Sequence, residues 1–318
     1  MQQEYDITLS KATADNLLSL AREQSMLEEA RICELHEICT DTLERAYTVF
    51  GDEFEIFDVL SLFSELTLDF DAESNTDVLE NNLERLNEYQ RQLSLFDKAV
   101  LCELILEFLN KKGRNITESD FLKQKHKDET FVYVKNPFAD EAYDVFAESF
   151  SNPRIKYAKD FREALQFLSD GEVSYCLLPL EDKGGSRIHS VAQLIFNGDF
   201  KINSVTPVFG FDGLADMKYA LVSKHFTLPR TNKDDDRYLE IRIPKDTDTP
   251  LSEILLAAEL YKHGIYRIGT VEFDTEEGAE RFYSIVFRDE GRDFTNLLTY
   301  LTLFTSSYSP IGVYKNLE

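Results

Sequence analysis

The sequence predicts a multidomain α+β protein with a helical domain (1–125), an α/β lobe (130–228) and a small C-terminal β-α-β-β-α-β module (237–318). Three observations predict this fold class. Residues 12–112 contain one Gly and no Pro, and their apolar residues recur at helical spacing. Beyond residue 130, short strand-like runs alternate with helical segments. Polar and charged stretches separate the three regions.

The helical region is predicted to contain a long, a short and a long helix. The first helix ends at Gly51, the second covers 54–66, and Thr76 is the N-cap of a third that ends at Lys112. One face of the third helix carries Leu79, Leu83, Leu86, Leu93, Phe96, Val100, Leu104 and Phe108. Such wide apolar faces need a partner, and a second copy of the chain is one candidate.

The two C-terminal regions differ in their order of elements. In the lobe we expect strands at 131–134, 155–158, 173–178, 201–209 and 218–223, and helices at 139–150, 161–168 and 191–196. This alternation favours βαβ units and a mostly parallel sheet. In the module we expect strands at 238–243, 265–273, 282–288 and 311–314, and helices at 251–263 and 294–304. This order is the ferredoxin-like arrangement.

The stretch Gly171–Ile188 is the first candidate for a site. Its short apolar run, Val173–Leu178, ends at Pro179 and is followed by the charged cluster Glu181-Asp182-Lys183 and by Gly184-Gly185. Ligands of open α/β sheets bind just past the carboxyl ends of strands, and glycine amides can approach a ligand closely. The alternative is a solvated loop between a strand and a helix, and the local sequence leaves both interpretations open.

The same stretch carries a family resemblance, which covers roughly residues 130–318. The residues in question are Phe161, Ala164, Leu165, Gly171, Tyr175, Pro179 and Glu181. In this order they resemble the first lobe of prephenate dehydratases, and Asn136-Pro137 stands where that family has a Gly-Pro turn. The resemblance implies a set of ligand-binding candidates: Asn136, Glu181, Asp182, Lys183, Gly184, Ser186 and Lys218.

The departures from that family concern the residues that carry its chemistry. Asp182 and Lys183 replace the Asn-Ser of the motif, and Met217 stands at the position of the family's catalytic Thr. A thioether donates no hydrogen bond. Where the family inserts a whole second lobe, this chain has 22 residues, Ile195 to Asp216, whereas one βαβ unit takes ~30. We therefore expect no dehydratase activity and assign no catalytic residue.

The tail from Tyr238 is similar to the ACT regulatory domain that follows the dehydratase. Thr249-Pro250-Leu251 stands where the family has a Gly-Ala-Leu turn, and Glu272 begins the counterpart of its Glu-Ser-Arg-Pro motif. The resemblance implies Thr249, Leu251 and Glu272 as effector-site candidates. Because both motifs have changed, we expect dimerisation rather than phenylalanine binding.

The N-terminal helices resemble, in their order, the chorismate mutase domain of bifunctional proteins. Chorismate is a dianion, and its rearrangement needs several cations at fixed places. Residues 1–125 hold 12 Lys and Arg against 27 Asp and Glu, a net charge of 12 − 27 = −15. The spacing of Arg22, Arg31 and Arg45 does not reproduce the mutase pattern, so we interpret them as solvated.

Composition excludes several classes of partner. A net charge of −25 without a Lys/Arg patch argues against nucleic acids and anionic membranes. No apolar run approaches the ~18 residues of a membrane span, and the N-terminus lacks signal-peptide features, so we expect a cytoplasmic protein. The cysteines fit neither zinc nor disulfide spacing and are predicted to be reduced core thiols: Cys33, Cys39, Cys102 and Cys176. We predict no metal site and no cofactor.

Two functional hypotheses follow. The first is a catalytically inactive, prephenate dehydratase-like protein related to phenylalanine biosynthesis. It would act as a metabolite-sensing or partner-binding homo-oligomer, a dimer through its ACT-like and helical domains, with a small aromatic or dicarboxylate ligand. The second is an active prephenate dehydratase (a lyase) or chorismate mutase (an isomerase) with sites completed across a dimer. Lys183, Arg187 and Lys218 would then supply the cations.

Overall fold

The computed structural model describes residues 11–50, 93–122, 124, 129–210, 215–229, 236–275, 278–305 and 307–317. The chain divides into two compact units, Met1–Asn115 and Ile116–Glu318. The predicted helix over 54–66, its neighbour's N-cap Thr76 and most of the predicted linker at 228–237 lie outside the described residues.

The first unit contains α1 (Lys11–Phe50), which packs against α4 (Leu95–Lys111). The predicted third helix was expected to run through Leu93, and this is wrong, because α4 starts after Ser94. Ser94 Oγ accepts the Asp97 N–H at 3.2 Å, and the Asp97 carboxylate accepts the Ser94 N–H at 2.9 Å. This capping box satisfies backbone N–H groups at the start of α4.

The thiols of the first unit differ in exposure. Cys39 and Cys102 are buried, whereas Cys33 is exposed, so the prediction of core thiols fails for Cys33. Cys33 lies on α1 next to Glu34, which is also exposed, two residues before the buried Leu35. Burial, together with Cys102, raises the pKa of Cys39 to about 12.

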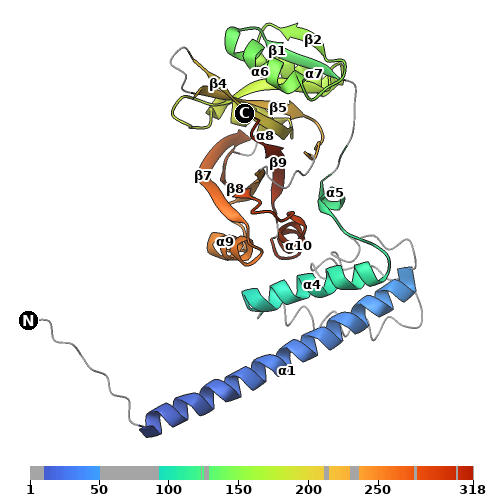
Figure 1. Cartoon of the computed structure of the whole chain (residues 1–318), viewed down its shortest axis with the longest axis vertical. Helices are drawn as coiled ribbons and strands as arrows, with labels where there is room; N and C mark the ends of the chain where they lie inside the picture. The colour runs from blue at the N-terminus through green and yellow to red at the C-terminus, as the bar shows by residue number, and fades with distance from the viewer. Residues whose placement is uncertain are drawn as a thin grey trace, which may run out of the picture. The chain divides into compact units, whose positions relative to one another are not determined.

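The strands described in the second unit form one mixed sheet (Figure 1). They are β1 (Thr130–Val134), β2 (Arg154–Ala158), β3 (Tyr175–Glu181), β4 (Lys201–Phe209), β5 (Ala215–Ser223), β6 (Arg237–Pro244), β7 (Gly264–Thr275), β8 (Gly278–Arg288) and β9 (Ser309–Lys315). Their order is β2-β1-β3-β5-β4-β9-β6-β8-β7. The mixed α/β character predicted for this part of the chain is confirmed.

Several helices are described in the second unit, and only some of them begin at a capping side chain. The helices are α5 (Glu118–Phe121), α6 (Pro137–Ala147), α7 (Phe161–Asp170), α8 (His189–Asn197), α9 (Leu251–Leu260) and α10 (Thr295–Phe304). Asn136 and Asp160 cap α6 and α7 with their side chains. Gly171 ends α7 at φ 75°, a left-handed conformation that glycine adopts without steric cost.

The pairing directions correct one expectation about the lobe. β1 is parallel to β2 and β3, but β5 is antiparallel to both β3 and β4. The mostly parallel sheet predicted from alternating elements is therefore wrong beyond β3. Only residues 210–214 separate β4 from β5, and a connection that short joins antiparallel strands.

The strands expected in the lobe and in the C-terminal module meet at β4 and β9. These two strands are parallel and pair at Ile202 and Gly312. A Cβ at Gly312 would lie 2.6 Å from the Ile202 carbonyl oxygen, so the close approach requires glycine. Beyond β9 the order is β9-β6-β8-β7, with each neighbouring pair antiparallel.

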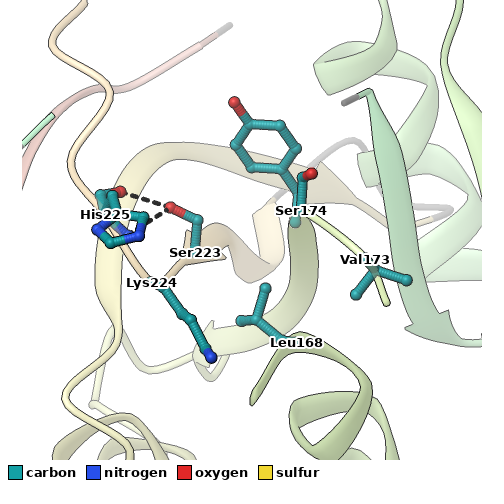
Figure 2. Close-up of a pocket in the computed structure, with 7 residues that line it drawn as sticks. Leu168, Val173, Ser174, Ser223, Lys224 and His225 are labelled. Carbon is teal, nitrogen blue, oxygen red and sulfur yellow. Dashed lines mark hydrogen bonds between the residues drawn. The ribbon is translucent and has the colours of Figure 1, made fainter. Parts of the chain in front are cut away.

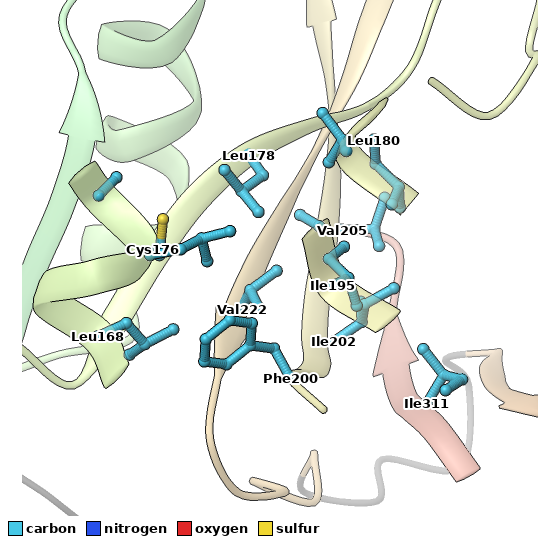
Figure 3. Close-up of a cluster of buried hydrophobic side chains, with 14 of the residues drawn as sticks. Leu168, Cys176, Leu178, Leu180, Ile195, Phe200, Ile202, Val205, Val222 and Ile311 are labelled. Atoms are coloured by element: carbon cyan, nitrogen blue, oxygen red, sulfur yellow. The ribbon is translucent and has the colours of Figure 1, made fainter. Parts of the chain in front are cut away.

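A buried apolar cluster supports the sheet on the side of α7 and α8. It includes Leu168, Cys176, Leu178, Leu180, Ile195, Phe200, Ile202, Val205, Val222 and Ile311 (Figure 3). These side chains come from α7, β3, α8, β4, β5 and β9, with Phe200 directly before β4, so one core serves strands that are far apart in the sequence. The carboxyl end of β3 is therefore packed against a buried apolar core.

Candidate functional site

Glu181 is the last residue of β3 and lies in a buried cluster of charges. It is 7% exposed. Its Oε1 lies 2.6 Å from Arg267 Nη1 and 3.6 Å from Arg187 Nε, and its Oε2 lies 3.4 Å from Lys218 Nζ. Of the predicted ligand-binding residues, the fold thus brings Glu181 and Lys218 together. Arg267 comes from β7, 86 positions later.

Arg187 extends the cluster to β6 and β9. Its Nη2 donates to the Glu240 carboxylate and, at 3.3 Å, to the Tyr314 hydroxyl, which in turn donates to Glu240 at 3.1 Å. Burial is the largest single effect and lowers the pKa of Arg187, but Glu240, Tyr314 and Glu181 together outweigh it and raise this pKa above its ordinary value. Burial and Glu240 also raise the pKa of Tyr314.

Sequence reasoning missed Glu240, Arg267 and Tyr314 as members of this cluster. A signal for Glu240 existed in β6, whose residues Arg237–Ile243 are all buried although three of them are charged. Charges at buried strand positions need partners. The identity of those partners depends on tertiary contacts and is not visible in the local sequence.

The glycine loop after β3 is a tight turn whose backbone N–H groups donate hydrogen bonds within the loop. Asp182 Oδ1 accepts the Gly184 and Ser186 N–H groups, both at 2.9 Å. The Gly185 N–H donates to the Asp182 carbonyl at 2.8 Å, and Gly185 has φ 73°. Of the two interpretations left open for this stretch, the geometry favours the structural loop, because Asp182 takes the place of a ligand.

The cavity beside Glu181 is small. Its volume is about 10 Å³, and it is lined by Leu180, Glu181, Arg187, Val205, Lys218, Tyr238, Tyr266, Arg267, Val286, Tyr314 and Asn316. One water needs about this much space, whereas small-molecule sites measure roughly 300–1,000 Å³. The cavity therefore has no room for an organic substrate.

A second small cavity lies at the opposite end of β3. It also measures about 10 Å³ and is lined by Leu168, Val173, Ser174, Tyr175, Ser223, Lys224 and His225 (Figure 2). The Ser223 hydroxyl is hydrogen-bonded to the backbone of His225, and Lys224 Nζ donates to the Ser169 carbonyl. The Ser223 hydroxyl and the Lys224 ammonium are therefore hydrogen-bonded within the chain.

A larger groove lies between the start of α7 and one side of α8. It has a volume of about 700 Å³ and is lined by Asp160, Arg162, His189, Ser190, Gln193, Leu194 and Asn197. Its volume falls in the range of small-molecule sites. Six of its seven lining residues have polar or charged side chains, but most of the surface that they present to the groove is apolar.

Three other predicted residues of the lobe have structural partners. The Asn136 side chain accepts the Ala139 N–H at 3.0 Å and donates to the Val134 carbonyl at 2.9 Å. Lys183 Nζ lies 2.9 Å from Asp216. Met217 packs against the apolar cluster on the α6 side of the sheet. None of these contacts joins Asn136 or Lys183 to Glu181.

The structure places the predicted effector residues of the tail on different elements. Thr249 is buried and its hydroxyl donates to the Phe304 carbonyl. Leu251 begins α9, directly after Pro250. Glu272 lies on the exposed β7–β8 ladder and pairs with Arg281 at 2.7 Å. Among the described residues, Thr249 and Glu272 share no hydrogen bond.

Two of the three arginines named for the first helix also have carboxylate partners. Arg31 lies 3.0 Å from Asp97, and Arg45 lies 2.8 Å from Asp41 one turn earlier on α1. Arg22 is exposed. Within the described ranges, no group of three or more His, Cys, Asp and Glu is arranged to hold a metal. Of the helices described, none has the length and apolarity that crossing a bilayer requires.

Comparisons with known proteins find similar folds only. No family model and no curated protein matches the chain. A prephenate dehydratase from Streptococcus mutans is similar over 60% of this chain and 100% of that one, with 14% identity and a TM-score of 0.47.

Two further structures are similar to about the same degree. One is a prephenate dehydratase from Arthrobacter aurescens in complex with L-Phe (13% identity, TM-score 0.44, 58% of this chain and 89% of that one). The other is GqqA, described as a novel type of quorum quenching acylase. It has 15% identity and a TM-score of 0.44, and the similarity covers 59% of this chain and 96% of that one. Similarity at this level assigns neither a family nor a function.

Proposed function

We propose that the chain is a cytoplasmic, prephenate dehydratase-like protein without dehydratase activity, which acts as a metabolite-sensing or partner-binding homo-oligomer related to phenylalanine biosynthesis. One observation carries the proposal: the carboxylate of Glu181, the residue that matches the family motif, is buried and contacts three cations. A carboxylate in this state offers no free oxygen to a substrate. The adjoining cavity holds no more than about one water.

The surroundings of Glu181 support the same conclusion. Met217, at the position of the catalytic Thr, packs into an apolar cluster and donates no hydrogen bond. Most of the segment between Ile195 and Asp216 is the end of α8 and β4, and β4 lies between β5 and β9 in the sheet. A strand in that position cannot serve as the opposing wall of a cleft.

The alternative, an active enzyme with sites completed across a dimer, needs cations that are free to bind a dianion. Lys183 is paired with Asp216, Arg187 with Glu240, and Lys218 with Glu181. A substrate would have to displace a carboxylate of the same chain from each of them. These pairings favour the non-catalytic proposal.

The oligomeric part of the proposal rests on the C-terminal strands. We interpret residues 237–318 as an ACT-like domain from their β-α-β-β-α-β order, beside a dehydratase-like lobe at 130–228 and a helical domain at 1–125. β7 is an edge strand. Five apolar side chains on α9 and β7 are 43–51% exposed: Leu256, Leu260, Ile265, Tyr266 and Ile268. An exposed apolar edge of this kind favours pairing with a second copy.

The purified chain tests the proposal directly. Incubated with prephenate, it should form no phenylpyruvate above the buffer control, measured by absorbance. Conversion that disappears in a Glu181→Ala variant would contradict the proposal.

Thermal unfolding with chorismate, prephenate or phenylalanine then separates the two roles. A ligand at ~100 times its dissociation constant stabilises by about 2.7 kcal/mol. Such a shift supports metabolite sensing, and its loss in Arg162→Met would locate the ligand in the groove between α7 and α8. The absence of any shift supports partner binding.

A further inference from the structure

The cluster around Glu181 contains more positive than negative charge. Its cations are Arg187, Lys218 and Arg267, and its carboxylates are Glu181 and Glu240. Three positive against two negative charges leave an excess of one. Excess charge in a largely buried place is costly unless a counter-ion compensates it.

Arg187 has one donor that the protein leaves unsatisfied. Its Nε faces Glu181 and its Nη2 contacts Glu240 and Tyr314. Its Nη1 is buried and has no hydrogen-bond partner among the described residues. Because a buried donor without a partner is destabilising, this nitrogen favours a bound water or anion.

The cavity lined by Arg187, Lys218 and Arg267 limits the size of the water or anion that can bind there. About 10 Å³ accommodates something close to one water and excludes an organic carboxylate. Lys218 and Arg267 each have side chains that are 28% exposed, so their long stems can adjust to an ion slightly larger than water.

We propose that this cavity binds a monoatomic halide anion, held by Arg187, Lys218 and Arg267. A halide accepts hydrogen bonds from all three cations and reduces the excess charge, whereas a water satisfies Arg187 Nη1 and leaves the charge unchanged. The ion stabilises the contact between the end of β3 and β7. This site is separate from the proposed sensory function and does not depend on it.

Thermal unfolding in halide and gluconate salts tests the site. At constant ionic strength, replacing sodium gluconate by sodium bromide should raise Tm along a saturating curve, because gluconate is too large for the cavity. Lys218→Met should weaken the apparent bromide affinity at least about tenfold. Glu181→Gln should change it in the opposite direction by a similar factor, since it removes the one carboxylate that lines the cavity.

Arg281→Gln is the matched control, because Arg281 is an exposed arginine paired with Glu272. It should leave the bromide response unchanged. Crystals grown in bromide should show an anomalous peak beside Arg187, and a water at that position would overturn the proposal. The same holds if Tm follows ionic strength alone, or if Lys218→Met responds to bromide like the wild type.

Discussion

Arg237 and Glu118 form a bidentate ion pair in the interior of the second unit. Arg237 Nη1 and Nη2 lie 2.8 and 3.0 Å from the two carboxylate oxygens of Glu118, and the arginine is 3% exposed. Arg237 Nε also contacts Asp289 at 2.7 Å, and Glu118 accepts the Phe294 N–H at 2.7 Å. The pair thus ties α5 to the starts of β6 and α10.

Removing the charge of Glu118 should therefore destabilise the second unit. In Glu118→Gln, Arg237 keeps Asp289 but loses its bidentate partner, and breaking a buried pair costs about 3–5 kcal/mol. We expect a loss near the lower end, measured as the free energy of unfolding in urea. Glu290→Gln, which removes an exposed partner of Arg288, is the control and should cost little. Equal effects of the two variants would refute the structural role of the pair.

His263 gives the second unit a pH-dependent stability. The ring is buried, packs 4.8 Å from the Phe294 ring and has no partner at Nδ1 among the described residues. Its pKa falls from 6.5 to about 4, mainly because of burial. The positive charges of Arg237 and Arg292 also lower this pKa, whereas the negative charges of Asp289 and Asp293 raise it. Because this pKa is lower in the folded state, the unfolded chain takes up the proton first as the pH falls.

The contribution of His263 is thus complete above pH 6.5 and is lost as the pH falls towards 4. Between pH 6.5 and 4.5 the wild type should lose roughly 2 kcal/mol more than His263→Asn, which does not titrate. Urea unfolding of both proteins at several pH values measures the difference. Parallel pH profiles would show that His263 titrates normally in the folded state.

Local patterns predicted the elements better than the site. The strand expected at 201–209 is β4 without any change of bounds, because Gly198 and Gly210 stand close to its two ends in the sequence. The start of α4 could not be read from periodicity, since the apolar spacing continues through Ser94. The capping pair Ser94 and Asp97 was the available signal.

The partners of Glu181 were beyond local sequence reasoning. The family motif points to Lys218, but Arg267 lies 86 residues from Glu181 and on a strand expected in another domain. Only the joining of both regions in one sheet brings it near. The burial of Glu181 among its three cations therefore depends on the pairing of β4 with β9.

Gly312→Ala tests that pairing. The new Cβ would lie 2.6 Å from the Ile202 carbonyl oxygen, a backbone atom that cannot move without separating the two strands. Overpacking of this kind costs about 1–3 kcal/mol, which unfolding in urea would measure. Gly269→Ala is the matched control in β7, because its nearest neighbour would be a carbonyl oxygen 4.0 Å away. If Gly312→Ala is as stable as Gly269→Ala, then β4 and β9 do not approach each other as closely as described.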